Sequence, residues 1–292
     1  MKILITGSSG RVGKVLAHYF SRIAPTKHEV IGVDILPGAY TSIRENILSH
    51  DLVPLIKTAD AIIHCAALHA PHVNSHSEQA FWDTNVSSTE QLLKHARDDA
   101  SIVLTSTTSV YGHALEPSMK GSLKQRNNAI WVDENLTPKA RDIYDTTKLA
   151  AEALVNALNC ERRSSCVLRI SRCFPEPEEL MALYRLYRGV DLRDVAQAHA
   201  LALERKTGNA TYVISGPDVF QPSDIVKLAR NAPELIASRA PALKAYFDEN
   251  GFTLPQSIDR IYSSTLAMKE LAYRPRFGMR EFLSGDRKPE AL

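Results

Sequence analysis

The sequence ILITGSSGRVG at residues 3–13 places three glycines directly after a short apolar run. The apolar residues predict a buried strand, and apolar positions then recur at helical spacing from Val12 to Ile23. The glycines of the intervening turn are Gly7, Gly10 and Gly13. Glycine lets the backbone take positive φ and approach a ligand closely, and the unpaired N–H groups at a helix start favour an anion. We expect the pyrophosphate of a dinucleotide to bind at this turn.

A carboxylate at the end of the second predicted strand supports this interpretation. Residues 29–34 (EVIGVD) end in Asp34, which follows Gly13 by 21 residues, close to the spacing expected for the group that binds the adenine ribose. Asp34 would repel a 2′-phosphate, which favours NAD over NADP, although Arg11 in the turn partly offsets that repulsion. The alternatives are a polar turn residue at Asp34 and a simple tight turn at the glycines, whose Gly-x-x-Gly-x-x-Gly spacing differs from the common fingerprint.

Composition narrows the class of protein. The chain has 292 residues, 44% of them hydrophobic, and a formal net charge of +2, which argues for a globular protein and against a nucleic-acid binder. No apolar run approaches the roughly 18 residues of a membrane span, and strand one leaves no room for a leader, so we expect a cytoplasmic protein without a membrane partner. We expect no metal, because the cysteines lack metal-ligand spacing; they are Cys65, Cys160, Cys166 and Cys173.

Strands and helices alternate along the first two thirds of the chain. This order predicts an α/β fold with a Rossmann-type doubly wound parallel sheet, followed by a small mixed C-terminal cap. The further expected strands are 61–65, 101–106, 166–170 and 210–215, and the expected helices are 80–96, 144–158, 192–204, 222–240 and 264–271. We expect residues 1–175 to form the NAD-binding domain, with its last sheet elements returning near 190–216. Residues 176–292 are then an interleaved substrate-binding cap, and residues 113–139 are the most loop-like stretch.

Two further segments carry candidate chemistry. The fourth main strand ends in TSTTSVYG (105–112), and the helix after the loop begins with YDTTK (144–148). The four-residue spacing places Tyr144 and Lys148 on one helix face, where an ammonium favours the ionised phenolate. A tyrosine of ordinary pKa about 10 can then act as an acid or base near neutrality. The alternative is an exposed helix pair worth a few tenths of a kcal/mol.

Together these pieces resemble the extended short-chain dehydrogenase/reductase superfamily, in its NAD-dependent epimerase/dehydratase branch. The resemblance spans about residues 1–205 and returns at LAYRP (271–275). It implies that Tyr144 is the acid/base, that Lys148 bonds the nicotinamide ribose, and that Thr107 holds the reacting oxygen, with Ser106 as second choice. The implied cofactor-binding residues are Gly7, Ser9, Gly10, Arg11, Val12, Gly13, Asp34, Asp51, Leu52, Cys65, Ala66, Ala67, Asn85, Thr105, Tyr144 and Lys148. Asp51 and Leu52 would flank the adenine, and Asn85 could instead cap or pack within its helix.

Departures from the family pattern narrow the expected activity. Related dehydratases and decarboxylases place an acid where this chain has Thr108 or Ser109. Arg172 replaces the asparagine that touches the nucleotide diphosphate in sugar-nucleotide epimerases, and only about 20 residues separate Pro175 from Asp194. The segment around Arg172 partly resembles uronate dehydrogenases, which bind a free sugar acid.

These features indicate an NAD-dependent oxidoreductase that transfers a hydride from a hydroxyl or hemiacetal carbon of a small, anionic, sugar-like substrate. The expected substrate-binding residues are His69, Thr107, Thr108, Arg172 and Arg185. Arg172, Arg185 and Arg188 could instead form surface or dimer salt bridges, and His69, His72 and His76 could be surface histidines. The alternative functions are a nucleotide-sugar 4-epimerase with tightly bound NAD and a non-catalytic dinucleotide-sensing regulator. We expect a homodimer, because apolar helix faces near 80–96 and 150–158 form a dimer contact in the family.

Overall fold

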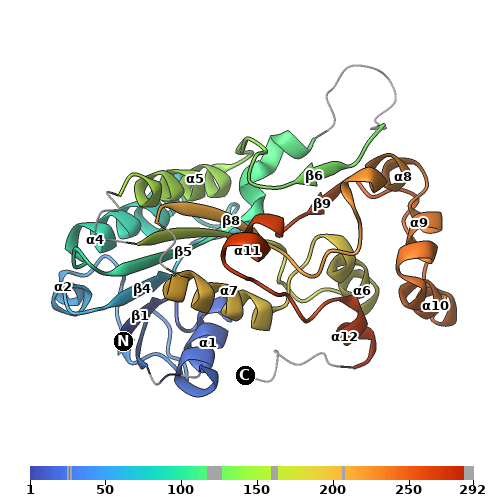
Figure 1. Cartoon of the computed structure of the whole chain (residues 1–292). Helices are drawn as coiled ribbons and strands as arrows, with labels where there is room; N and C mark the ends of the chain where they lie inside the picture. The colour runs from blue at the N-terminus through green and yellow to red at the C-terminus, as the bar shows by residue number, and fades with distance from the viewer. Residues whose placement is uncertain (25, 27, 117–126, 159–163, 206–207, 286–292) are drawn as a thin grey trace.

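A seven-stranded parallel sheet forms the centre of the fold (Figure 1) in the computed structural model, which describes the chain except for residues 25, 27, 117–126, 159–163, 206–207 and 286–292. The strand order is β3-β2-β1-β4-β5-β7-β8, and every neighbouring pair is parallel. The strands are β1 (Lys2–Thr6), β2 (Glu29–Asp34), β3 (Ile43–Arg44), β4 (Ala61–His64), β5 (Ser101–Thr107), β7 (Ser165–Ile170) and β8 (Ala210–Ile214). This topology confirms the predicted doubly wound parallel sheet.

Helices cover both faces of the sheet because its central strands are apolar on both sides. Side chains alternate between faces along a strand, so Ile3 and Ile5 pack with one layer of helices and Leu4 with the other. The first layer contains α1 (Arg11–His18) and α7 (Leu192–Arg205), and the second contains α2 (Val53–Ile56), α4 (Ser88–His95) and α5 (Ile143–Asn156). Helix α3 (Glu78–Trp82) leads into α4 through a π-helical turn, Asp83–Ser87, within the helix predicted at 80–96. A π-helical turn also extends α1 over Tyr19–Ile23, where Ile23 is exposed.

A second hydrophobic cluster lies beside the carboxyl ends of β5 and β7. It buries Leu186, Leu228, Ile236, Phe247 and Phe282 among short helices. These helices are α6 (Glu178–Tyr187), α8 (Ile225–Arg230), α9 (Ala232–Arg239), α10 (Pro241–Glu249) and α12 (Met279–Leu283). They form the region that we call the cap, together with a parallel pair of strands, β6 (Ile130–Val132) and β9 (Arg260–Tyr262). The boundary of the first domain at residue 175 stays a prediction.

Several cap elements differ from the predicted ones. Strand β6 lies inside the stretch 113–139 that we expected to be a loop, and residues 117–126 of that stretch are outside the described residues. Neither β9 nor α12 was predicted, whereas α11 (Thr265–Glu270) matches the last expected helix and packs on the core of the main sheet through Ala267. Short 3-10 turns complete the fold at His50–Leu52, Ala70–His72, Thr108–Leu115 and Pro222–Asp224.

A buried ion pair ties α5 to the end of the sheet. The Arg169 guanidinium on β7 donates to both carboxylate oxygens of Glu152 on α5, at 2.7 Å for Nη2 to Oε2 and 3.1 Å for Nε to Oε1. The Ser106 hydroxyl on β5 donates to the same carboxylate at 2.5 Å, and Arg169 also donates to the Tyr111 hydroxyl at 3.2 Å. The pair therefore fixes β5, β7 and α5 relative to one another.

We expect Glu152→Gln to lower the free energy of unfolding by about 3–5 kcal/mol, because the change keeps the side-chain shape but leaves the buried Arg169 charge unpaired. Urea unfolding of the purified protein measures this loss. Lys244→Gln is the matched control: it removes an exposed pair with Asp248 and should change stability by at most about 1 kcal/mol. A loss for Glu152→Gln no larger than the control's would contradict the assigned role.

Candidate active site

One cavity of about 740 Å³ runs along the carboxyl ends of the strands, from the glycine turn to the cap. Gly7 and Asp34 line one end, Tyr144 and Lys148 line the middle, and Arg260 of the cap lines the other end. Parallel α/β sheets bind their ligands at this edge, because the strand ends and the loops that follow them converge there.

The glycine turn has no room for side chains. A Cβ atom at Gly13 would lie 2.0 Å from the Gly7 carbonyl oxygen, and one at Gly7, where φ is +72°, would lie 2.7 Å from the Ala66 nitrogen. Helix α1 begins after Gly10 without a side-chain cap, so its first N–H groups face the cavity that the turn lines. All the expected residues of the turn line the cavity: Gly7, Ser9, Gly10, Arg11, Val12 and Gly13.

Asp34 holds the turn and lines the cavity at the same time. Its two carboxylate oxygens accept hydrogen bonds from the N–H groups of Ser9 and Leu36, each at 2.9 Å. An acid fixed at this point presents negative charge where a ribose 2′-substituent would lie.

The structure does not place Asp51 and Leu52, which we expected to flank the adenine, in the wall of the cavity. The 3-10 turn at His50–Leu52 directs Leu52 into the core under the sheet and leaves Asp51 exposed, and neither residue lines the cavity. Asn46 and Ile47, in the loop that follows β3, line that end instead. A two-residue strand gives little sequence signal, so the sequence did not show where this loop begins.

The predicted catalytic residues meet in the middle of the cavity. Helix α5 begins at Ile143 because the Asp142 side chain accepts the Asp145 N–H at 2.9 Å, and this start places Tyr144 in the first turn and Lys148 one turn later. The Thr107 side chain, from the end of β5, lies near enough to the Tyr144 phenol to lower its pKa, and the Lys148 ammonium donates to the Thr105 carbonyl at 2.8 Å.

Burial shifts both titrating groups of this pair. Desolvation raises the pKa of Tyr144 well above its usual value, and the nearby Thr107 hydroxyl lowers this pKa only in part. Desolvation also lowers the pKa of Lys148 to about 8, against the raising effect of Glu152. The Tyr144 phenol is therefore neutral by itself and needs added positive charge to ionise near neutral pH.

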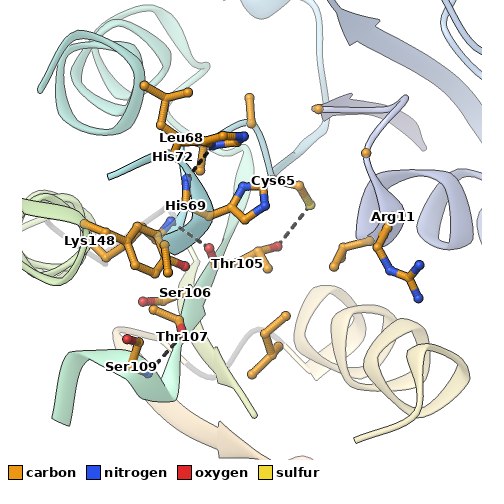
Figure 2. Close-up of a pocket in the computed structure, with 18 of the residues that line it drawn as sticks. Arg11, Cys65, Leu68, His69, His72, Thr105, Ser106, Thr107, Ser109 and Lys148 are labelled. Carbon is orange, nitrogen blue, oxygen red and sulfur yellow. Dashed lines mark hydrogen bonds between the residues drawn. The ribbon is translucent and has the colours of Figure 1, made fainter. Parts of the chain in front are cut away.

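Ser106, the second choice for the catalytic hydroxyl, faces another way. Its hydroxyl donates to Glu152 in the core, whereas Thr107 accepts the Ser109 N–H at 3.0 Å at the cavity wall (Figure 2). The alternation of side chains along β5 separates the two neighbouring hydroxyls. Thr107 is therefore the hydroxyl that the structure brings to Tyr144.

A directed chain of hydrogen bonds lies under the cavity floor. Burial lowers the pKa of His199 to about 4, so its ring is neutral, and Nδ1 donates to the Val195 carbonyl at 2.8 Å. Nε2 must then accept the Thr105 hydroxyl at 2.8 Å. Thr105 in turn accepts the Cys65 thiol at 3.0 Å, and Figure 2 marks the bond between these two residues. Cys65 and Thr105 line the cavity as predicted, and so do Ala66 and Ala67. His199 was not predicted, because it lies on a helix whose sequence signals only an apolar face.

Asn85 does not line the cavity, so the structure does not support its predicted contact with the cofactor. Its side chain accepts the Leu68 N–H at 2.8 Å, donates to the Leu68 carbonyl at 3.0 Å, and donates to the Thr147 hydroxyl at 3.0 Å. Asn85 thus fixes the loop after β4 against α5, which agrees with the alternative of a packing role.

The predicted substrate residues divide into two groups. His69, Thr108 and Arg172 line the cavity together with Thr107, whereas Arg185 is buried elsewhere in an ion pair with Asp191 at 3.0 Å. Arg185 lies on the face of α6 that packs toward the loop before α12, and it also donates to the Phe277 carbonyl. The lining residues that the sequence did not assign include His72, His76, Arg141, Ser171, Arg260 and Tyr262. Within the described ranges, no group of three His, Cys, Asp or Glu side chains is arranged to hold a metal ion.

We expect Asp34→Ala to narrow the preference for NAD over NADP by at least about tenfold, because a fixed carboxylate near a phosphate repels it by more than the 1.4 kcal/mol that a factor of ten requires. The variant should also bind NAD more weakly, since the Ser9 and Leu36 N–H groups lose their acceptor. Titration of both dinucleotides measures the two effects. Glu45→Ala is the control, because Glu45 is an acid at the same end of the cavity as Asp34, and it should leave the ratio of NAD to NADP affinity unchanged. A native protein that prefers NADP would contradict the interpretation.

Comparison with known proteins places the chain in a family. The sequence profile described as "NAD dependent epimerase/dehydratase family" matches residues 3–178. A relative in Bacillus subtilis, named uncharacterized UDP-glucose epimerase YtcB, is 32% identical over 177 residues, covering 53% of this chain and 50% of the relative. UDP-glucuronic acid decarboxylase 1 of Arabidopsis thaliana is 30% identical over 184 residues, covering 60% of this chain and 39% of the relative. The matches thus span half or less of the length of these relatives.

Solved structures share the fold over nearly the whole chain. MoeE5 in complex with UDP-glucose and NAD has a TM-score of 0.67 at 20% identity, covering 97% of this chain and 96% of its own. UDP-glucuronic acid 4-epimerase from Bacillus cereus, solved with UDP-glucuronic acid and NAD, has a TM-score of 0.66 at 21% identity, covering 97% of each chain. Among the described residues no helix is both long and apolar enough to cross a membrane. The profile match confirms the predicted resemblance and NAD as the cofactor: the chain belongs to the NAD dependent epimerase/dehydratase family.

Proposed function

We propose that this protein is an NAD-dependent oxidoreductase that oxidises a hydroxyl or hemiacetal carbon of a small, anionic, sugar-like substrate. The observation that carries the proposal is the convergence of Thr107, Tyr144 and Lys148 on the cavity that also contains the glycine turn. A hydroxyl, a phenol and an ammonium at one point of a dinucleotide site can remove the proton that must leave as a hydride departs.

The glycine turn and Asp34 fit NAD, and the residues beside them have separate roles in proton transfer. The glycines let the turn close tightly where its backbone lines the cavity, so the N–H groups at the start of α1 can bind a pyrophosphate, and Asp34 suits an unphosphorylated ribose. Bound NAD supplies a hydride acceptor and a positive charge. Tyr144 accepts the proton of the substrate hydroxyl, and Thr107 holds the same substrate oxygen through its own hydroxyl. Lys148, one turn after Tyr144 on α5, carries a positive charge below its pKa of about 8, and we propose that this charge and that of bound NAD favour ionisation of the phenol.

The charges along the cavity support an anionic substrate. Among the described lining residues the acids are Asp34 and Glu45, both at the adenine end. Arginines line the opposite end: Arg141, Arg172, Arg188 and Arg260. Several relatives are named for UDP-glucuronic acid, a sugar that carries a carboxylate, which agrees with this polarity. An acid beside Thr107 that could manage a second proton, as in dehydration, is absent from the described lining, where Thr108 and Ser109 follow it.

A nucleotide-sugar 4-epimerase with tightly bound NAD is the second candidate, because the relatives are named for UDP-sugars. Arg172 in the place of asparagine and the short link from Pro175 to Asp194 favour a free sugar over a nucleotide sugar. A non-catalytic dinucleotide sensor would not need the Tyr144 and Lys148 pair, which is present here with Lys148 buried and Tyr144 half-buried in the cavity wall. The homodimer and the cytoplasmic location stay predictions.

We expect Tyr144→Phe to reduce turnover by about 100-fold or more, because positioned proton transfer contributes at least this factor. The dissociation constant for NAD should change little, since the phenol acts on the substrate. Steady-state rates and an NAD titration measure the two quantities. Tyr246→Phe removes a phenol in the cap that bonds to Glu178 and should keep the native rate. Retention of more than about a tenth of the turnover by Tyr144→Phe would exclude it as the acid/base.

We expect one NADH per substrate oxidised when the protein meets a free aldose or sugar acid, since a dehydrogenase releases reduced cofactor in every cycle. UDP alone should not stabilise the fold, whereas a ligand of the native state raises stability by RT ln(1 + [L]/Kd). NADH absorbance and thermal unfolding with millimolar UDP test both points. Interconversion of UDP-sugars without NADH accumulation, or a clear thermal shift with UDP, would favour the epimerase instead.

A further inference from the structure

We infer that Arg188, with Ser171, forms a subsite for a single carboxylate at the cap end of the cavity. The inference rests on the proposed function for the identity of the molecule that carries the carboxylate. Arg188 takes the substrate-binding role that we expected of Arg185, because Arg185 forms an ion pair with Asp191. Ser171 is a new candidate that no sequence pattern indicated.

Backbone pairing brings the two residues together. Arg172 and Gly189 form a parallel bridge, in which the Arg172 N–H donates to the Arg188 carbonyl at 3.1 Å and the Val190 N–H donates to the Arg172 carbonyl at 2.9 Å. Ser171 and Arg188 each precede one member of the bridge, so they lie side by side. Both residues line the cavity.

Aromatic groups hold the Arg188 guanidinium in place. Its Cζ lies 4.7 Å from the centre of the Tyr184 ring, and its charge lowers the pKa of the neighbouring Tyr187 phenol against the raising effect of burial. The Arg172 guanidinium lies near the same Tyr184 ring, at 5.6 Å. A guanidinium held this way loses little further freedom when it binds an anion.

The neighbouring arginines already have carboxylate partners. Arg172 pairs with Glu176, Arg260 pairs with Asp259, and Arg141 pairs with Asp145 at 3.3 Å. In the parts of the chain that the structure describes, Arg188 has no ion pair with an acid, so this end of the cavity has one uncompensated positive charge.

Two buried donors at the subsite also lack acceptors. Ser171 is 3% exposed, and its hydroxyl has no hydrogen-bond partner among the described residues. The Nε of Arg188 is also buried and also has no hydrogen-bond partner there. Buried donors without acceptors are unfavourable, and a bound carboxylate would satisfy both. The Arg188 guanidinium supplies one positive charge and a planar pair of N–H donors. This arrangement matches a carboxylate, with one negative charge, better than a diphosphate, with two.

The test compares hexuronic acids with the matching neutral hexoses. Glucuronate, galacturonate, glucose and galactose are titrated into the NAD-loaded protein by calorimetry, and NADH formation is followed with each. We expect Arg188→Gln to weaken binding of the preferred uronate by roughly 10- to 100-fold and Ser171→Ala by a few-fold, because charge-assisted hydrogen bonds are the stronger ones. Binding of NAD and of the neutral sugars should not change. Arg280→Gln, at an exposed arginine outside the cavity, is the matched control.

The outcomes separate the subsite from the proposed function. Uronate binding that depends on Arg188, but without NADH formation from any free sugar, would support the subsite and overturn the proposed oxidation. NADH formation with equal efficiency from uronates and neutral hexoses would support the oxidation and overturn the subsite. Uronate binding that Arg188→Gln leaves unchanged, or no uronate binding by the native protein, would also overturn the subsite. Unchanged NAD affinity in Arg188→Gln shows that the variant is folded.

Discussion

The buried ion pair between Glu152 and Arg169 fixes the geometry on which the whole site depends. Glu152 lies on α5 one turn after Lys148 and two turns after Tyr144, so the three side chains share one face of the helix. Arg169 lies on β7 two residues before Ser171, and Ser106, the third partner, lies on β5 next to Thr107. A single carboxylate thus orients the elements that bring the phenol, the ammonium and the reacting hydroxyl together. Desolvation makes such a pair expensive to break, which suits a part of the molecule that should not move.

Local sequence patterns predicted the parts of the site that depend on local geometry. The glycine turn, Asp34, and the Tyr144 and Lys148 pair occupy the cavity as expected, because spacing along one strand, turn or helix decides where such residues lie. The resemblance to the family favoured Thr107 over Ser106, and the alternation of side chains along β5 explains why only one of these neighbours faces Tyr144.

Residues that depend on tertiary contacts could not be placed from the sequence. Arg185 and Arg188 are three positions apart on the same helical segment, and only the packing of the cap decides that the first pairs with Asp191 and the second faces the cavity. Asn85 has the family's residue type, yet its partner is the loop at Leu68. Strands β6 and β9 are three residues long and far apart in the chain, so neither gave a periodic signal, and the assignment of Arg260 to the cavity was missed with them.

The β6 and β9 ladder also limits how a substrate can enter. Strand β6 precedes α5 in the chain and β9 comes near its end, so the cap is connected to the sheet through several segments instead of one linker. A rigid swing of the cap would have to bend all of these connections at once, whereas two-domain enzymes open by bending a hinge. The cavity is lined by side chains that can move without the cap, among them His69 and Phe174, whose rings stack with their centres 5.8 Å apart. Such rotamer changes are fast compared with domain motions, so a small molecule would enter the cavity faster than a domain motion would allow.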